Sequence, residues 1–193
     1  MASAAKVILA SGSPRRRQLL AAQGIEFEAA ESGVPEVPAH GESPRAYALR
    51  LAEEKALAVS ARNPGALVVG ADTTVVCGGE LLEKPASPAD ARRMLKLLSG
   101  RTHIVVTAFA IARDGAILES APVESAVTFR VLTDEEIDAY VATGDPFDKA
   151  GAYGIQSIGA GFVTNVEGSR DNVMGLPAAR VAAALVRHGA IAK

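Results

Sequence analysis

RTHIVVTAFAIAR spans residues 101–113 and is followed by Asp114-Gly115 and then by AILESAPVESAVTFR at residues 116–130. The predicted fold depends mainly on these two runs and the turn between them. β-Branched and apolar residues dominate both runs, and an Asp-Gly pair between two such runs is a strong signal for a β-hairpin. Both runs exceed the usual strand length, so strong twist or a bulge is expected. The sequence therefore predicts one long, twisted hairpin.

Shorter elements are expected on both sides of this hairpin. Strands are predicted at residues 7–10, 25–30 and 67–71 and through Val166, with the chain continuing extended at 73–76. Helices are predicted at 14–23, 44–62, 88–99, 133–143 and 176–188. Ser13, Ser43 and Ser87 each precede a proline, which is typical of an N-cap with proline at the first helical position. The strands and helices alternate without a simple strand–helix–strand rhythm, which favours a mixed sheet. The predicted fold class is α/β, with a mixed, strongly twisted sheet and flanking helices.

Composition and net charge exclude several classes of binding partner and location for this chain. The chain has 193 residues, and 20 Lys and Arg against 22 Asp and Glu give a formal net charge of -2. Nucleic-acid and anionic-membrane binders normally carry a basic excess, so neither partner is expected. The single cysteine, Cys77, excludes an internal disulfide, and no apolar run is long enough for a membrane span. We expect one cytoplasmic domain over residues 1–193, with Cys77 as a small core residue.

The turn Leu9-Ala10-Ser11-Gly12-Ser13-Pro14 leads into three consecutive arginines, Arg15 to Arg17, in the first turn of the predicted helix. Cations are unfavourable at the positive end of a helix. A bound anion would resolve that conflict, because free N–H groups, hydroxyls and guanidinium groups all suit phosphate. The alternative is a capped surface helix whose arginines point into water.

Two lysines and a carboxylate are further candidate functional residues. Lys55 shares a helical stripe with apolar residues, so it either extends its ammonium to solvent or meets negative charge. Asp72 ends the apolar run of residues 67–71, where a charge needs a partner, a metal or a catalytic role; the alternative is that it caps a turn. Lys84 lies between a strand and a helix, where side chains often face a cleft.

A glycine-rich stretch at residues 145–156 contains Asp148, Lys149, Tyr153 and Gln156. Glycines there would let the backbone approach a ligand closely, although an irregular loop is equally compatible. His40, His103 and His188 lack the spacing of a metal site. A polyphosphate, a divalent metal and a polar base would together use all the candidate residues.

Five motifs in register resemble the Maf family. They are LASGSPRR (9–16), GADT (70–73), LEKP (82–85), SGRTH (99–103) and KAGAYGIQ (149–156), and the resemblance extends to GLP at 175–177. It therefore covers nearly the whole chain. The resemblance implies a nucleotide pyrophosphatase that splits a nucleoside triphosphate into monophosphate and pyrophosphate. It also implies two lobes with a cleft between them, a fold related to the inosine triphosphate pyrophosphatases, and a homodimer.

The resemblance also implies roles for individual residues. Asp72 resembles the proton acceptor that activates water. Glu36, together with Asp72, matches the acidic positions near the metal, with Glu31 as a competitor for the place of Glu36. The metal is expected to be Mg²⁺, with Mn²⁺ as the alternative. The other matched positions are linked to substrate specificity (Arg15, Thr73 and Gln156) and to the phosphates (Ser11, Arg16, Lys55 and Lys84).

The block at residues 151–156 resembles the branch that acts on dTTP and UTP. A carboxamide such as Gln156 offers one donor and one acceptor, which match N3–H and a neighbouring carbonyl of uracil or thymine. Two alternatives remain at this point. One is a 7-methyl-GTP pyrophosphatase, and the other is a regulator of septum formation that binds nucleotide without hydrolysing it.

Overall fold

The structure is a computed structural model that describes residues 5–190. The chain divides into two compact units. The first unit comprises Met1–Asp72, Thr107–Val123 and Gly175–Lys193, and the second comprises Thr73–Val106 and Glu124–Met174. The single bilobed domain over residues 1–193 stays a prediction.

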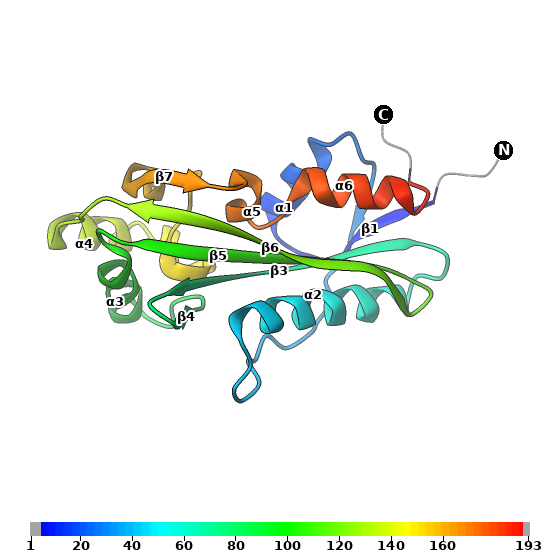
Figure 1. Cartoon of the computed structure of the whole chain (residues 1–193), viewed down its shortest axis with the longest axis horizontal. Coiled ribbons are helices and arrows are strands. Elements are labelled where there is room, and N and C mark those ends of the chain that lie inside the picture. Colours follow the sequence, from blue (N-terminus) through cyan, green and yellow to red (C-terminus); the bar gives the residue numbers. More distant parts are fainter. Residues whose placement is uncertain (1–4, 191–193) are drawn as a thin grey trace. The chain divides into compact units, whose positions relative to one another are not determined.

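Seven strands of the described residues form one mixed sheet in the order β2-β1-β3-β5-β6-β7, with β4 paired to β3 (Figure 1). β1 (Val7–Leu9) pairs in parallel with β2 (Glu28–Ala29) and β3 (Leu67–Cys77). β4 (Glu80–Leu82) is antiparallel to β3, and β7 (Val163–Glu167) is antiparallel to β6 (Ala116–Phe129). The predicted mixed sheet is confirmed.

The hairpin that decided the prediction is present. β5 (Thr102–Arg113) and β6 are joined by Asp114 and Gly115, which have φ values of 52° and 77°. Positive φ at both central residues is what a two-residue turn between twisted strands requires. The register of β6 against β7 shifts between Thr128 and Phe129, in agreement with the expected bulge.

The helices begin where the serine–proline pairs predict. Ser13, Ser43 and Ser87 cap α1 (Pro14–Ala21), α2 (Pro44–Ser60) and α3 (Pro88–Leu98) with their side chains. α4 (Asp134–Ala142) begins at a capping box formed by Thr133 and Glu136. The glycine-rich stretch contains 3₁₀ helices at Asp145–Asp148 and Ala150–Ala152, and another at Ile158–Phe162 follows it.

Two predicted boundaries are wrong, and two short elements were not predicted. The helix expected at 176–188 is α6 (Ala178–Arg187), and a separate short helix, α5 (Arg170–Met174), precedes it. Gly175, with a φ of 113°, breaks the helical path between them. The strand expected at 25–30 is reduced to two residues, and β4 was not predicted at all, because a three-residue strand depends on its partner in the sheet.

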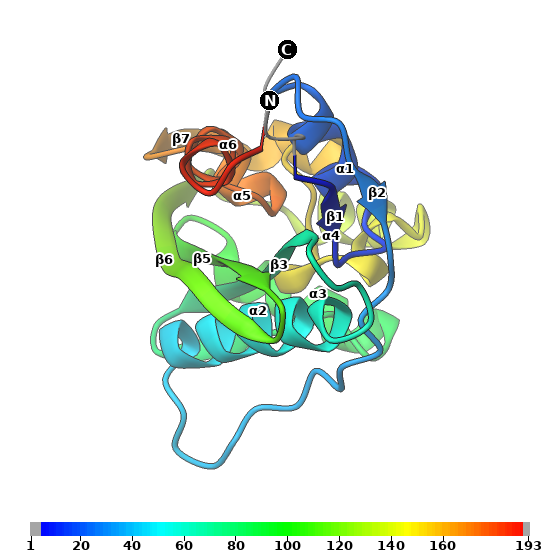
Figure 2. The ribbon, with the colours of Figure 1, turned by 90° about the vertical axis from the view of Figure 1, so that its right-hand side faces the viewer.

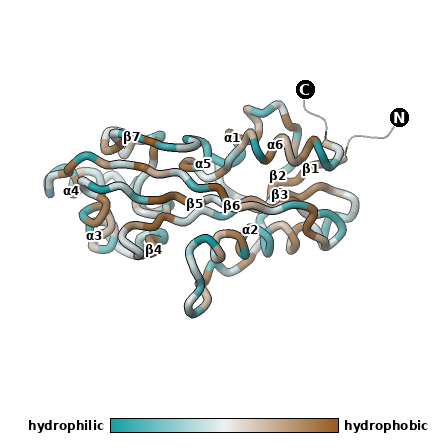
Figure 3. Tube along the Cα trace, in the orientation of Figure 1, coloured by the Kyte–Doolittle hydropathy of each residue, from teal (hydrophilic) through white to brown (hydrophobic). Residues whose placement is uncertain are grey.

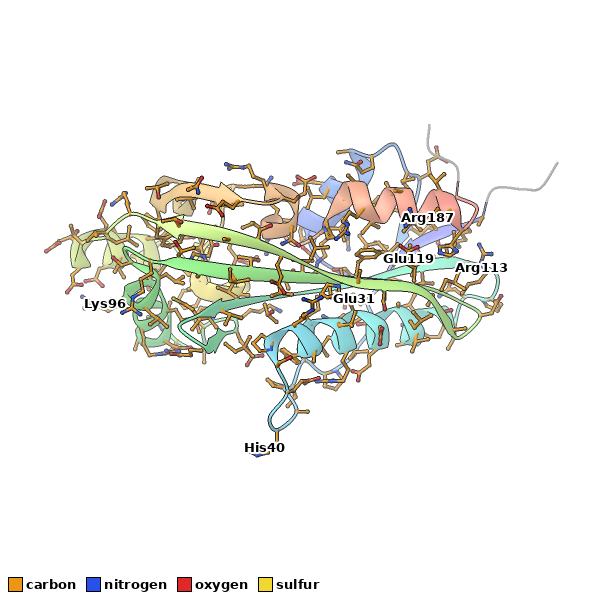
Figure 4. The ribbon with its side chains drawn as sticks, in the orientation of Figure 1. Glu31, His40, Lys96, Arg113, Glu119 and Arg187 are labelled. Atoms are coloured by element: carbon orange, nitrogen blue, oxygen red, sulfur yellow. The ribbon has the colours of Figure 1, made fainter. Side chains whose placement is uncertain are left out.

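In the first unit, α2 and α6 cover opposite faces of the sheet (Figures 1 and 2). Gly70 of β3 allows α2 to approach, because a Cβ at this position would lie 2.1 Å from the carbonyl oxygen of Ala52 and 2.7 Å from the nitrogen of Ala56. On the other face, the guanidinium of Arg187 on α6 lies 2.6 Å from the Glu119 carboxylate on β6 (Figure 4).

The second unit has its own core, in which buried side chains of α3, α4 and the strands meet Phe129, Tyr153 and Phe162. Cys77 is buried in this core, which confirms the prediction for it. His103 is also buried, with Nε2 2.8 Å from the Tyr153 hydroxyl, and burial lowers its pKa to about 4. It is therefore a neutral core residue at physiological pH.

Hydrophobic residues are concentrated along β3 and β5, as the hydropathy colouring in Figure 3 shows. Within residues 5–190, no helix is both long and apolar enough to span a bilayer.

The Gly70→Ala substitution tests the close approach of α2 to β3. Because the added Cβ would meet backbone atoms that cannot rotate away, we expect the free energy of unfolding to fall by about 3 kcal/mol, as overpacking of a core typically does. Gly161→Ala is the matched control, since a Cβ at Gly161 meets nothing within 4 Å. Urea denaturation of both variants measures the effect, and equal stabilities for the two would contradict the packing described.

Candidate active site

Helix α2 and strand β3 bring Lys55 and Asp72 into direct contact in the first unit. The ammonium nitrogen of Lys55 lies 2.6 Å from Oδ1 of Asp72 and 2.6 Å from Oε1 of Glu36. Lys55 is 4% exposed and Asp72 is 6% exposed. Of the two interpretations of Lys55, the one in which it meets negative charge is confirmed, and the one in which it reaches solvent is wrong.

Asp72 lies within β3 and not at the end of a strand, which corrects the prediction. β3 continues to Cys77, because Val75 to Cys77 pair with β4. The interpretation that Asp72 caps a turn is therefore wrong as well. Side chains alternate between the two faces of a strand, so Asp72 shares the face of Gly70, the face against which α2 packs.

Burial raises the pKa of the Asp72 carboxyl above its ordinary value, although the charges of Lys55 and Arg16 oppose this effect. A buried carboxylate with a raised pKa is a stronger base than one in water. The charge of Lys55 favours the ionised form of this carboxylate, because an ionised group out of water needs a counter-charge.

Glu36 and Glu31, the two acidic residues that competed in the sequence, have different surroundings. Glu36 contacts Lys55 through a carboxylate that is 41% exposed. Glu31 lies instead beside Gly12, where a Cβ would be 2.9 Å from its Oε1 (Figure 4 labels Glu31). The structure thus brings Glu36, and not Glu31, to the Lys55–Asp72 pair.

The loop that carries Glu36 is fastened by Arg50, a residue that the sequence analysis missed. Its guanidinium contacts Glu42 at 2.7 and 2.8 Å, the carbonyl oxygen of Val37 at 3.1 Å and Glu54 at 3.1 Å. The spacing of Arg50 and Glu54 by four residues on a helix was a visible signal, but such pairs are common on helix surfaces. The contact with Val37, the residue after Glu36, connects this group to the loop position of Glu36.

The predicted phosphate turn is also part of the first unit. Ser11 is buried, and its hydroxyl oxygen accepts hydrogen bonds from Ser13 N at 3.2 Å and from Arg16 Nη1 at 3.3 Å. Arg16 also donates from Nε to the carbonyl oxygen of Gly175 at 2.7 Å. Burial lowers the pKa of Arg16, and the nearby charges of Asp72 and Glu36 counteract that effect.

The three arginines therefore differ in their surroundings. Arg16 turns inward to Ser11, Arg15 is half-buried, and Arg17 is exposed. Together with Lys55, Arg16 places two cations near the two carboxylates of Asp72 and Glu36. This charge-balanced cluster holds a buried carboxylate beside ammonium and guanidinium groups, which are groups that bind phosphate oxygens.

The remaining predicted residues belong to the second unit. Thr73 is half-buried and follows Asp72 on β3, where the alternation of side chains places it on the opposite face. Lys84 is exposed between β4 and α3, and Gln156 is exposed in a turn between two 3₁₀ helices. The roles of these three residues and of Arg15 stay predictions.

Protein metal ligands were sought among His, Cys, Asp and Glu. No group of three or more of these residue types is arranged to hold a metal ion within residues 5–190. His40 illustrates the scatter of the histidines, since it lies at the tip of the loop before α2 (Figure 4). A metal in the first unit would therefore have at most the two carboxylates Glu36 and Asp72 as protein ligands from the cluster.

The fold belongs to the α/β class, with a mixed sheet and flanking helices. It is similar to the solved structure of a HAM1 protein from Coxiella burnetii, with a TM-score of 0.50, 15% sequence identity and coverage of 95% of this chain and 99% of that one. This likeness confirms the predicted fold class.

Family membership follows from sequence comparisons. The family model described as Maf-like protein matches residues 6–188. Two relatives named dTTP/UTP pyrophosphatase are similar over nearly their full lengths. The one from Geobacter sulfurreducens is 50% identical and covers 96% of this chain and 98% of that protein, and the one from Geobacter metallireducens is 51% identical with 96% and 97% coverage. The chain belongs to the Maf family.

The Lys55→Met substitution tests the buried ion pair. It leaves Asp72 as a buried carboxylate without its nearest counter-charge, so we expect the free energy of unfolding at pH 8 to fall by about 3 kcal/mol. In the variant the pKa of Asp72 lies further above its value in the unfolded chain. Stability is then lost as pH rises through the folded pKa, and the deficit should shrink toward pH 5.

Urea denaturation at both pH values measures this loss, and Lys55→Met/Asp72→Asn is the control. Removing the uncompensated carboxylate should restore much of the stability at pH 8. A deficit that is the same at both pH values, with no recovery in the double variant, would show that Lys55 does not neutralise Asp72.

Proposed function

We propose that this chain hydrolyses dTTP and UTP to the monophosphate and pyrophosphate, with Asp72 as the proton acceptor. The observation that carries the proposal is the buried Asp72 carboxylate held by Lys55 in a member of a pyrophosphatase family. The names of the two Geobacter relatives support the choice of substrates. A base next to phosphate-binding cations is what attack of water on a phosphoanhydride needs.

In the proposed reaction, a water molecule attacks the α-phosphorus and transfers a proton to the Asp72 carboxylate. A new bond forms between the water oxygen and the phosphorus, and the bond from the α-phosphorus to the bridging oxygen breaks, which releases pyrophosphate. Burial helps this step, because it raises the pKa of Asp72 and so strengthens the base. Lys55 orients the carboxylate through its 2.6 Å contact with Oδ1.

The phosphates are proposed to bind at the turn of Ser11 and Arg16, with Arg15, Lys55 and Lys84 as further cations. The support is chemical: a hydroxyl, backbone N–H groups at a capped helix start and guanidinium groups all bind phosphate oxygens. One pair of opposite charges about 4 Å apart is worth about 4 kcal/mol at an effective dielectric constant near 20. Preorganised cations therefore stabilise the charge that develops on the departing pyrophosphate.

A divalent cation, Mg²⁺ or alternatively Mn²⁺, fits the donor set of this cluster. Mg²⁺ in phosphate-processing sites is usually held by one or two carboxylates, with water and the substrate phosphates as the other ligands. Glu36 and Asp72 would supply those carboxylates. When bound, the ion would neutralise negative charge on the phosphates.

Base selection is proposed to rest on Gln156, with Arg15 and Thr73 as further specificity residues. The carboxamide of Gln156 can pair with N3–H and one carbonyl of uracil or thymine at the same time. The exposure of Gln156 in its turn leaves the side chain accessible to a base. A homodimer is proposed on family resemblance alone, and light scattering of the purified protein tests it.

The proposed activity is tested by measuring pyrophosphate release from a panel of triphosphates with Mg²⁺. We expect the highest kcat/KM for dTTP and UTP. A preference for 7-methyl-GTP would overturn the proposed substrates and retain the reaction. Nucleotide binding by the folded protein without pyrophosphate release from any of them would favour the regulatory alternative.

The Asp72→Asn substitution tests the proton acceptor. An amide keeps the shape of the side chain but cannot take a proton, so we expect kcat for dTTP to fall by about 10²- to 10⁴-fold. Binding of dTMP, measured by calorimetry, should change by less than about threefold, since the phosphate-binding cations are retained. The matched control is Asp138→Asn at a surface ion pair with Arg92. A kcat near that of the control would remove Asp72 from catalysis.

The Gln156→Ala substitution tests base selection. We expect kcat/KM to fall more for dTTP and UTP than for poorer substrates, because a site built to hydrogen-bond a substrate group loses its discrimination when that bond is removed. Gln23→Ala, at a glutamine just after α1, is the control. A uniform fall across all triphosphates would mean that Gln156 supports the loop or the phosphates and does not contact the base.

A further inference from the structure

The turn of residues 154–157 in the second unit carries Gln156 at its third position. Its ends are joined by a hydrogen bond of 3.3 Å from the nitrogen of Ser157 to the carbonyl oxygen of Gly154. Ile155 is buried, with 4% exposure, whereas Gln156 is exposed. The conformation of this turn therefore determines where the Gln156 carboxamide lies.

Both ends of the turn are connected to one carboxylate oxygen. Oδ2 of Asp145 accepts a hydrogen bond from the Tyr140 hydroxyl at 2.5 Å and another from the Ser157 hydroxyl at 2.6 Å. The Tyr140 oxygen in turn accepts from the backbone nitrogen of Gly154 at 3.2 Å. Asp145 thus holds the first residue of the turn through Tyr140 and the last residue directly.

Lys149 completes this group from the other side of the carboxylate. Its ammonium donates to Oδ1 of Asp145 at 2.9 Å and to the Asp145 carbonyl oxygen at 2.5 Å. Its aliphatic stem packs under the turn, because a Cβ on Gly154 would lie 2.7 Å from Cε of Lys149 and 2.6 Å from Oγ of Ser157. Glycine at position 154 therefore lets the Lys149 stem and the Ser157 hydroxyl lie close against the turn.

The Tyr140 ring and the Tyr140 hydroxyl have separable tasks. The ring is 2% exposed and packs edge-on against Phe162 at a centroid distance of 5.1 Å, a contact that phenylalanine would keep. The hydroxyl instead joins Asp145 to Gly154. Hydrogen bonds to a charged acceptor are roughly twice as strong as neutral ones, so such a group fixes geometry firmly.

We propose that Asp145, with Tyr140 and Ser157, is a positioning group for base recognition, which locks the turn that presents Gln156. This inference rests on the proposed function of Gln156 and adds residues that do not touch the substrate. A catalytic or binding group displaced by about 1 Å can lose about 10²-fold in rate. Loosening the turn should therefore weaken base discrimination more than it weakens hydrolysis itself.

The test uses Tyr140→Phe and Ser157→Ala in the full chain, with Ser157→Thr as the conservative variant that keeps a hydroxyl. Tyr153→Phe is the matched control, because it removes another buried tyrosine hydroxyl, which contacts His103 at 2.8 Å and not Asp145. Two quantities are measured: hydrogen exchange at the Gly154 amide, and the preference for UTP over CTP. These nucleotides differ only at the base edge.

We expect Tyr140→Phe to accelerate exchange of the Gly154 amide at least tenfold and to lower the UTP-to-CTP ratio of kcat/KM about tenfold. Ser157→Ala should lower the ratio similarly, Ser157→Thr should retain it, and Tyr153→Phe should leave it within about twofold of the unmodified protein. In a Gln156→Ala background, Tyr140→Phe should have no further effect on the UTP-to-CTP ratio, because the positioning group acts on base preference through Gln156.

Two results would each overturn the inference: unchanged exchange at Gly154, or faster exchange with an unchanged preference for UTP. Failure of the proposed function is a different outcome, namely no pyrophosphate release from UTP by the unmodified protein. In that case the ratio of Kd values for UTP and CTP replaces kcat/KM. A ratio that Tyr140→Phe lowers would support the positioning group, and a ratio that it leaves unchanged would reject it.

Discussion

The contact of Lys55 with Asp72 depends on how closely helix α2 approaches strand β3 at Gly70. A Cβ on residue 70 would overlap the backbone of α2, so glycine there lets the helix lie against the strand. Lys55 follows Ala52 by three residues on the helix and Asp72 follows Gly70 by two on the strand, which places both on the facing surfaces. A buried lysine and a buried carboxylate are each costly alone, and the close packing lets each neutralise the other.

The Lys55 ammonium also contacts a part of the chain that lacks regular secondary structure. The loop between β2 and α2 forms no helix or strand, yet its Glu36 reaches Lys55. Arg50 fastens the loop one residue further along, at the carbonyl oxygen of Val37. Two cations on one helix therefore determine the path of a loop that carries a candidate metal ligand. In the second unit a carboxylate, Asp145, does the same for a turn.

Local signals in the sequence predicted the local features well. The Asp-Gly turn, the serine–proline caps and the apolar stripe of α2 each involve neighbours within a few residues, so they can be recognised without the fold. The errors concern contacts made at a distance. Asp72 was expected at the end of a buried strand, whereas β3 runs through it to Cys77, where it pairs with β4. The hydrogen bonds of Asp145 with Tyr140 and Ser157 join parts of an irregular loop, and no hydrophobic periodicity in the sequence predicts them.

The two units are interleaved along the chain, and this has a consequence for synthesis. The first unit includes residues 175–190, which are synthesised after every segment of the second unit, and Arg16 finds its carbonyl acceptor on Gly175. At about 5–20 residues per second, the interval between Asp72 and Gly175 lasts about 5–20 s. During that time the segments that carry Lys55 and Asp72 lack helix α6, which belongs to the same unit. An incomplete unit of this kind exposes hydrophobic surface, which makes a nascent chain prone to aggregation.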